Sequence, residues 1–383
     1  MTAATKPRRS LRLAGAAAAV VCLCTLSLFA ARRAAAAEPT PALAYYYIWF
    51  DPSSWARAKK DYPLLGRYSS DERAIMRQHI QWAKKAGLDG FMVSWKSTPL
   101  LNSRLEKLIR VADQEDFKLA IVYQGLDFAR QPLPAARIAS DLESFADDYA
   151  RDPAFRIFNL PLVIWSGTPE FSPAEVASVT RKLRGRLLVL ASERDPTAYR
   201  RLADWVDGDA YYWSSVDPAT FPHYAERLAG FGHTVHAHGG LWIPPAAPGF
   251  DARLVGGTSI IERRDGETFR LELDAAQSSS PDAVGIISWN EFSENTHIEP
   301  SEHYGARYLA VLADVLGAEA PVVDNFDSDA PAATDVGYGI PLLAGLALVV
   351  LGGLTLRRTS RNRAARRDRR SRHADMARGG AEG

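Results

Sequence analysis

The sequence predicts an α/β fold for the central part of the chain, namely a (β/α)8 TIM barrel in a single catalytic domain. Short apolar runs rich in β-branched and aromatic residues alternate with segments of helical period, which is typical of a parallel sheet. There are eight such runs over about 280 residues, and a (β/α)8 barrel typically needs about 250. A doubly wound open sheet is the alternative, but no glycine-rich phosphate loop follows an early strand.

The eight expected strands follow one another along the chain, with amphipathic helices between them. The strands are residues 42–49, 88–95, 119–123, 160–165, 187–191, 208–213, 234–242 and 283–289. A capping box at Ser69–Glu72 is expected to open the first helix, and Gly87 to close it. Four segments carry an apolar stripe at helical spacing: Ile75, Met76, His79, Ile80 and Ala83; Leu101, Leu105, Leu108, Ile109 and Ala112; Ile138, Leu142, Phe145 and Tyr149; Phe221, Tyr224, Leu228 and Phe231.

The two ends of the chain differ from its centre. Residues 1–37 are basic, then apolar, then rich in alanine, which predicts a secretory signal peptide or an uncleaved signal anchor. Export by the Sec or the twin-arginine route stays open. Residues 336–356 carry no charge and are long enough to cross a bilayer of about 30 Å. The alternative for this segment is a buried core helix.

The C-terminal segment also predicts how the chain is oriented. Residues 357–383 contain ten arginines, and by the positive-inside rule they form a cytoplasmic tail. Residues 320–335 are an acidic, Pro/Ala-rich linker. We therefore expect a single-pass protein of the cell membrane, with the domain of residues 38–319 outside the cytoplasm.

Charge and cysteine content limit the possible partners of that domain. Of the 46 basic and 45 acidic residues, 16 basic and 3 acidic lie in the two ends, which leaves 30 basic and 42 acidic residues and a net charge of −12 between them. An acidic body is a poor partner for nucleic acid. Cys22 and Cys24 are the only cysteines and lie in the N-terminal apolar run, so we expect no disulfide and no cysteine-bound metal in the body.

Aromatic residues stand where the expected strands end. The active site of a (β/α)8 barrel forms at the carboxyl ends of its strands. Aromatic rings can stack on the apolar faces of a sugar, and nearby amides and carboxylates can bind its hydroxyls. The rings therefore predict a glycan-binding site, although large barrel-core residues are the alternative for any single ring. The candidates are Tyr46, Tyr47, Trp49, Trp95, Tyr212 and Trp242.

Residues 288–299, S-W-N-E-F-S-E-N-T-H-I-E, concentrate three carboxylates at the end of the last expected strand. Glycoside hydrolysis commonly uses one carboxylic acid and one carboxylate, and Glu291 and Glu294 are the candidates. Alternation along the strand predicts that Glu291 faces inward together with Trp289 and Ile287. A solvated acidic loop is the alternative.

Other chemistries find less support in the sequence. His236 and His238 share a face of an expected strand and could bind metal, but no third ligand is evident, which favours hydrogen bonding or packing. No G-x-S-x-G motif for a nucleophilic serine occurs. We therefore expect neither a metal nor another cofactor.

The carboxylate segment also carries a family resemblance. Residues 289–301, W-N-E-F-S-E-N-T-H-I-E-P-S, resemble the W-N-E-W-H-E-G-T-Q-I-E-P signature of glycoside hydrolase family 99 and family 99-like proteins, the endo-α-mannosidases and endo-α-mannanases. Residues 45–50, 87–95 and 243–251 are similar to further motifs of that family, in the same order. The likeness spans residues 42 to about 304, nearly the whole body.

The resemblance implies a (β/α)8 fold and retaining hydrolysis without metal. It makes Glu291 the base that takes the proton of the sugar 2-hydroxyl and Glu294 the acid/base, and it adds Asn290, His297 and Glu299 as substrate-binding candidates. The chain departs from the family pattern at five positions but keeps both glutamates. The departures are Phe292 for Trp, Ser293 for His, Asn295 for Gly, His297 for Gln, and Lys96 where a second Trp is common.

Together these features predict a membrane-tethered, extracytoplasmic, retaining glycoside hydrolase that cleaves α-glycosidic bonds, first of all in α-mannan. Two alternatives remain, a non-catalytic carbohydrate-binding surface protein on the same barrel and an α-glucanase. The sugar, its linkage, endo or exo action and the oligomeric state stay open.

Overall fold

The computed structural model describes residues 39–127 and 129–323. The chain divides after Thr40, and everything below concerns the unit that begins at Pro41. The predicted signal segment, the transmembrane helix at 336–356, the basic tail and most of the linker lie outside the described residues, so these assignments stay predictions. Within the described ranges, no helix combines the length and the apolar character that a membrane span requires.

Seven strands form one parallel sheet in the order β5-β4-β3-β2-β1-β11-β8, and two more form a parallel pair, β6-β7. Their bounds are β1 (Ala42–Tyr47), β2 (Gly90–Trp95), β3 (Lys118–Gln124), β4 (Leu162–Ser166), β5 (Leu188–Leu190), β6 (Gly208–Ala210), β7 (Leu241–Ile243), β8 (Pro245–Ala246) and β11 (Val284–Ile286). A bridge from Ala191 to Asp209 joins the end of β5 to β6. One residue, Pro244, separates β7 from β8, which pairs with β11. The strands therefore complete the expected TIM-like (β/α)8 arrangement.

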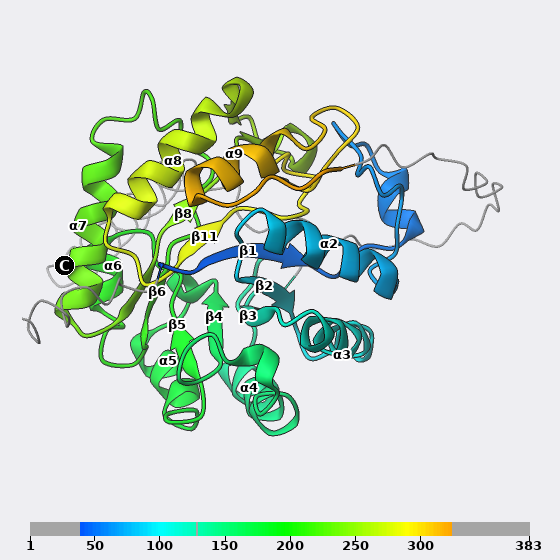
Figure 1. Ribbon diagram of the computed structural model, residues 1–383. Coiled ribbons are helices and arrows are strands. Elements are labelled where there is room, and N and C mark those ends of the chain that lie inside the picture. The colour runs from blue at the N-terminus through cyan, green and yellow to red at the C-terminus, as the bar shows by residue number, and fades with distance from the viewer. Residues whose placement is uncertain (1–38, 128, 324–383) are drawn as a thin grey trace, which may run out of the picture. The chain divides into compact units, whose positions relative to one another are not determined.

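The helices surround the strands (Figure 1). They are α2 (Arg73–Lys85), α3 (Pro99–Gln114), α4 (Ala135–Asp148), α5 (Pro173–Thr180), α6 (Pro196–Arg200), α7 (Tyr224–Ala237), α8 (Glu267–Ser278) and α9 (Arg307–Leu316). Short 3-10 turns occupy η1 (Pro52–Ala56), η2 (Pro153–Phe155), η3 (Thr168–Glu170), η4 (Ala252–Val255) and η5 (Arg264–Gly266), and β9 (Phe250–Asp251) pairs with β10 (Ile260–Ile261). The predicted stripes of α2, α3, α4 and α7 are largely buried.

Alternation along the strands divides the core into two layers. On β1, Leu43, Tyr45 and Tyr47 belong to the cluster inside the barrel, whereas Ala44 and Tyr46 belong to the cluster between strands and helices. Successive side chains of a strand point to opposite faces, so neighbouring rings in the sequence are separated in space. This division decides which of the predicted aromatic residues can reach a ligand.

Two boundary predictions were wrong. Residues 234–237 belong to α7 and not to a strand, so His236 and His238 lie at a helix end rather than on one strand face. Gly239, at φ +73°, follows the helix, and β7 begins only at Leu241. The helix expected from Ser69 begins at Arg73. The Ser69 N–H still donates to Glu72 Oε1 (2.6 Å), which is one of the two hydrogen bonds of a capping box. This bond lies in the turn that precedes the helix.

Candidate active site

The segment after β11 leaves the strand geometry before it reaches the carboxylates. Regular pairing ends at Ile286, and Ile287 still packs inside the barrel. Trp289 packs outward instead, with its ring 5.5 Å from His79 and 5.2 Å from Phe91 between centroids. The expectation that Ile287, Trp289 and Glu291 share one face was therefore wrong, because strand alternation does not continue past the last paired residue.

A tight turn holds Glu291 and Glu294 in one buried loop. The Glu291 N–H donates to Ser288 Oγ (2.8 Å), and the Ser288 N–H donates to the Thr296 carbonyl (2.9 Å). Glu291 is 2% exposed and Glu294 1%. Glu291 Oε1 accepts a hydrogen bond from the Ser293 N–H (2.9 Å), whereas within the described part of the chain neither carboxylate oxygen of Glu294 has a hydrogen-bond partner. The alternative of a solvated acidic loop is thereby excluded.

Burial gives the two carboxyl groups different proton affinities. It raises the pKa of Glu291 to about 7, against the lowering effects of the Ser293 N–H and the Lys59 ammonium. Burial also raises the pKa of Glu294 well above its usual value, and the charge of Glu291 raises it further while Arg130 lowers it. Near neutral pH, Glu291 can be ionised while Glu294 keeps its proton. Groups whose environments separate their pKa values in this way can serve as base and acid.

Two tyrosines lie beside this pair. The Tyr47 and Tyr212 hydroxyls are hydrogen-bonded to each other (3.0 Å). Burial raises the pKa of both well above the usual value, and the charges of Glu291 and Glu294 raise it further. The Trp49 ring lies 4.4 Å from that of Tyr47. Three of the six predicted aromatic residues are therefore brought together around the carboxylates.

A small cavity continues from the tyrosines into the barrel. Its lining combines hydroxyl groups with apolar side chains and consists of Tyr45, Tyr47, Val122, Ile164, Ser166, Ser192, Ala210 and Tyr212. The Tyr45 hydroxyl is buried and has no hydrogen-bond partner among the residues described. The cavity therefore extends from the tyrosines toward the barrel axis with a lining that is mainly apolar and carries a few hydroxyl groups.

The remaining predicted aromatic residues point away from the pair. Tyr46 stacks on Phe91 between the barrel and the helices. Trp95 donates from Nε1 to Asn102 Oδ1 (2.9 Å), and Trp242 donates to Ser279 Oγ (2.9 Å). For these three the alternative of a packing role holds, because each lies on the outward face of its strand.

Asn290 fixes the end of β1. Its Oδ1 accepts from the Tyr47 N–H (2.8 Å) and its Nδ2 donates to the Tyr47 carbonyl (3.0 Å). Behind it, the Tyr68 hydroxyl donates to Glu299 Oε2 (2.8 Å), and His79 Nε2 lies 3.0 Å from Glu299 Oε1. Asn290 and Glu299 thus support the wall of the site, and their predicted contact with substrate stays a prediction. Sequence reasoning gave Tyr68 and His79 no such supporting role.

His297 also supports the loop, and its predicted contact with substrate stays a prediction. Its ring stacks on Phe292 with centroids 4.0 Å apart, and its Nε2 lies 3.1 Å from Asp61 Oδ2. Burial, together with the charge of Arg263, lowers the pKa of His297 to about 4, so the ring is neutral at physiological pH. Among residues 39–127 and 129–323, no group of three or more His, Cys, Asp or Glu side chains is arranged to hold a metal ion.

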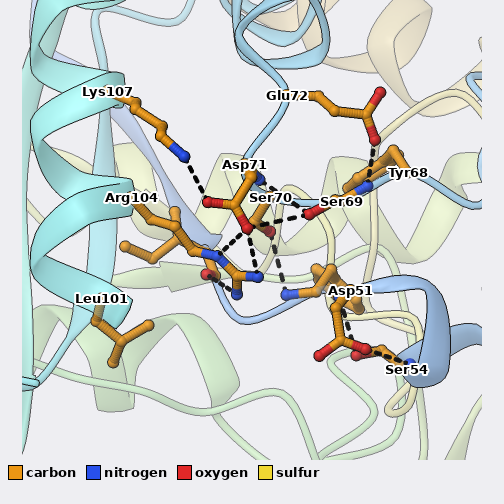
Figure 2. Close-up of polar contacts among 12 residues, drawn as sticks. Asp51, Ser54, Tyr68, Ser69, Ser70, Asp71, Glu72, Leu101, Arg104 and Lys107 are labelled. Carbon is orange, nitrogen blue, oxygen red and sulfur yellow. Dashed lines mark hydrogen bonds and ion pairs between the residues drawn. The ribbon is translucent and has the colours of Figure 1, made fainter. Parts of the chain in front are cut away.

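An ion pair between the buried Arg104 and the partly exposed Asp71 fixes the loop between β1 and α2, which includes Tyr68 (Figure 2). Arg104 on α3 donates to the Ile48 carbonyl (3.0 Å) and to Asp71 Oδ2 (2.9 and 3.0 Å). Sequence reasoning missed this residue. The signal was present, since Arg104 directly precedes Leu105 on the apolar stripe of α3, where a buried charge needs partners.

Comparison with known proteins gives a consistent result. No family model matches the sequence. Two curated proteins named "Glycoprotein endo-alpha-1,2-mannosidase-like protein" are similar, from Homo sapiens (22% identical over 266 residues) and Mus musculus (23% over 267). Each similarity covers 62% of this chain but only 56% and 57% of those proteins, so the chain spans about half the length of the curated relatives it matches.

Solved structures extend the likeness to the fold. A GH99 endo-alpha-mannosidase from Bacteroides thetaiotaomicron superposes with a TM-score of 0.64 at 21% identity, covering 73% of this chain and 96% of that one. A "Glycoside hydrolase-like protein" superposes with a TM-score of 0.60 at 18% identity, covering 73% and 94%. The chain resembles glycoside hydrolase family 99 in sequence and in fold.

The local structure accommodates three departures from the family 99 signature. Asn295 stands where the family has glycine, and its φ is +52°, a left-handed conformation that asparagine tolerates better than most side chains. Phe292 and His297 replace Trp and Gln, and they stack on each other within the loop.

Proposed function

We propose that this protein is a retaining glycoside hydrolase that cleaves α-glycosidic bonds, with α-mannan as its first candidate substrate. The observation that carries this proposal is the buried pair Glu291 and Glu294, held in one loop with separated proton affinities. The fold shared with a GH99 endo-alpha-mannosidase supports the same conclusion.

Each carboxyl group has a defined role in the proposed reaction. Glu291 takes the proton of the sugar 2-hydroxyl, whose oxygen attacks the anomeric carbon. The bond between the anomeric carbon and the glycosidic oxygen breaks as Glu294 donates its proton to that glycosidic oxygen, which departs with the leaving sugar and leaves a 1,2-anhydro sugar. Glu294 then takes a proton from water, which attacks the anomeric carbon, and the former 2-hydroxyl oxygen regains its proton from Glu291. Two inversions at one carbon give net retention.

The electrostatics fit these roles. A general acid must hold its proton until it is needed, and the environment of Glu294 favours the protonated form. A base must be ionised near the working pH, and Ser293 and Lys59 oppose the effect of burial on Glu291. One proton shared unequally between neighbouring carboxyls also avoids the cost of placing two like charges side by side.

The test is a substrate screen with the full-length protein. Defined α-mannans and α-glucans are incubated with the wild type, and new reducing ends and the anomeric configuration of the first product are measured. We expect cleavage of an α-mannan with retention, loss of turnover in Glu294→Gln, and unchanged turnover in the exposed control Glu226→Gln. Turnover that survives Glu294→Gln would refute the mechanism. Cleavage of α-glucan alone would identify an α-glucanase, and binding without turnover a non-catalytic lectin-like protein.

We also propose that residues 336–356 anchor the protein in the cell membrane, with the barrel outside the cytoplasm. The support is the uncharged 21-residue segment followed directly by Arg357 and Arg358. Protease added to intact cells should then digest the barrel and spare the tail, and extraction should require detergent. A protein released by salt alone would contradict the proposal.

A further inference from the structure

Arg263 connects the segment before α8 to the loop that carries the carboxylates. It is 5% exposed, and its Nη2 donates to the carbonyls of Asn295 (2.8 Å) and His297 (2.9 Å). Both carbonyls lie within three residues of Glu294 along the chain. One guanidinium group therefore ties down the backbone that directly follows the proposed acid/base.

The guanidinium itself packs against two aromatic rings of the C-terminal region of the barrel domain, which are edge-to-face with each other. Its central carbon lies 4.3 Å from the ring centres of both Tyr304 and Tyr308. A planar guanidinium stacks on such rings while it donates hydrogen bonds in its own plane. Arg263 thus contacts α9 and the turn before it through the two rings, and the loop of Glu294 through its hydrogen bonds.

The backbone next to Arg263 is strained. Arg264 (φ +44°), Asp265 (φ +52°) and Gly266 (φ +105°) follow it in left-handed conformations, and the first two are not glycine. Ion pairs of Arg264 with Asp217 and of Asp265 with Arg307 hold this turn. Strain of this kind persists where the surroundings determine the conformation, and it occurs often at functional sites.

Glu294 needs such support because nothing in the described protein holds its carboxyl group directly. Neither of its side-chain oxygens has a hydrogen-bond partner in the described residues. Two hydrogen bonds fix the backbone at and just after Glu294 instead. The Glu294 carbonyl accepts from the Asp251 N–H (2.8 Å), and the Asn295 carbonyl accepts from Arg263. The position of the carboxyl therefore depends on the backbone of the loop.

We propose that Arg263 is a positioning residue for Glu294, which it holds in place through the carbonyls of Asn295 and His297. The role in turnover rests on the proposed function. Lysine cannot replace the arginine fully, because an ammonium group offers no planar fork for the two carbonyls and packs less well against the aromatic rings. A small displacement of a catalytic group is enough to lower a rate constant by roughly 100-fold.

The test compares Arg263→Met and Arg263→Lys with the matched control Arg201→Met. Arg201 also donates to two carbonyls, those of Phe171 (2.6 Å) and Thr168 (3.1 Å), but it does not touch the loop of Glu294. Two readouts are measured on the full-length protein. One is kcat and KM on the substrate that the screen identifies. The other is the titration of the two buried carboxyls by ¹³C NMR of glutamate-labelled protein, assigned with Glu291→Gln and Glu294→Gln.

For Arg263→Met we expect kcat to fall by roughly 100-fold with KM within about threefold of wild type, since the loss concerns positioning rather than binding. The titration of Glu294 should differ from that of the wild type because its carboxyl group is displaced, and millimolar guanidinium ion should restore part of kcat. Arg263→Lys should lie between Met and wild type. Arg201→Met should lose thermal stability but keep kcat and both titrations.

Each outcome decides the question. An unchanged kcat and an unchanged Glu294 titration in Arg263→Met would overturn the proposal, as would equal losses in Arg263→Met and Arg201→Met. If Arg263→Met does not fold, Arg263→Lys carries the same comparison. If the wild type turns over no glycan, the proposed function fails, and the NMR titration still tests whether Arg263 positions Glu294.

Discussion

At alkaline pH the wild-type protein should be less stable than the variant Glu291→Gln. In Glu291→Gln the side chain keeps its size, and its Oε1 can still accept the hydrogen bond of the Ser293 N–H. The substitution removes the negative charge that Glu291, a residue only 2% exposed, can carry. The variant should therefore gain stability wherever the wild-type carboxyl must ionise.

The pKa sets the sign and size of this gain. Below pH 4.5, the usual pKa of a glutamate, Glu291 is protonated in both the folded and the unfolded chain, and wild type and variant should be equally stable. Between 4.5 and about 7 only the unfolded chain ionises, so the wild type loses stability as pH rises. Above both values the difference in the free energy of unfolding is about 3 kcal/mol. For a domain of this size that is on the order of 5–10 °C in Tm.

The assay is thermal unfolding of wild type, Glu291→Gln and the control Glu226→Gln at intervals from pH 4 to pH 9. We expect Glu291→Gln to match the wild type at pH 4 and to exceed it in Tm increasingly toward pH 8. Glu226 is exposed on α7, so its variant should follow the wild type throughout. A Tm difference that does not change with pH, or a less stable Glu291→Gln at pH 8, would refute the assignment of Glu291 as a buried carboxyl of raised pKa.

Three further outcomes follow from the same structure. The value of kcat/KM should rise as pH increases through about 7, where Glu291 ionises, and fall again when its acid partner loses its proton; a maximum below pH 5 in the pH profile would contradict the assignment. Arg104→Met should lower the free energy of unfolding by about 2 kcal/mol in urea titrations, because the Ile48 carbonyl loses its buried donor; an unchanged midpoint would show that the loop is held elsewhere. Tyr212→Phe should cost about 1 kcal/mol in the same assay through loss of the bond to Tyr47, and no cost would mean that water replaces it.

Sequence reasoning worked best where a local pattern decides the structure. The alternation of apolar runs with amphipathic segments predicted the TIM-like barrel, and the signature at residues 289–301 predicted the resemblance to glycoside hydrolase family 99. It failed where an element ends. Trp289 lies past the last paired residue of β11, so a period of two no longer determines its direction. His236 and His238 fall at a helix end that Gly239 sets.

The sequence by itself determined the order of strands and helices, the acidic charge of the body and the crowding of carboxylates at one strand end, because each of these depends only on residues near one another in the chain. The tertiary structure alone decided which side chains meet. Tyr47 and Tyr212 lie 165 residues apart and share a hydrogen bond, and Arg263 reaches the loop of Glu294 from the segment before α8. Closure of the barrel creates these contacts, and with them the burial that separates the proton affinities of the two glutamates.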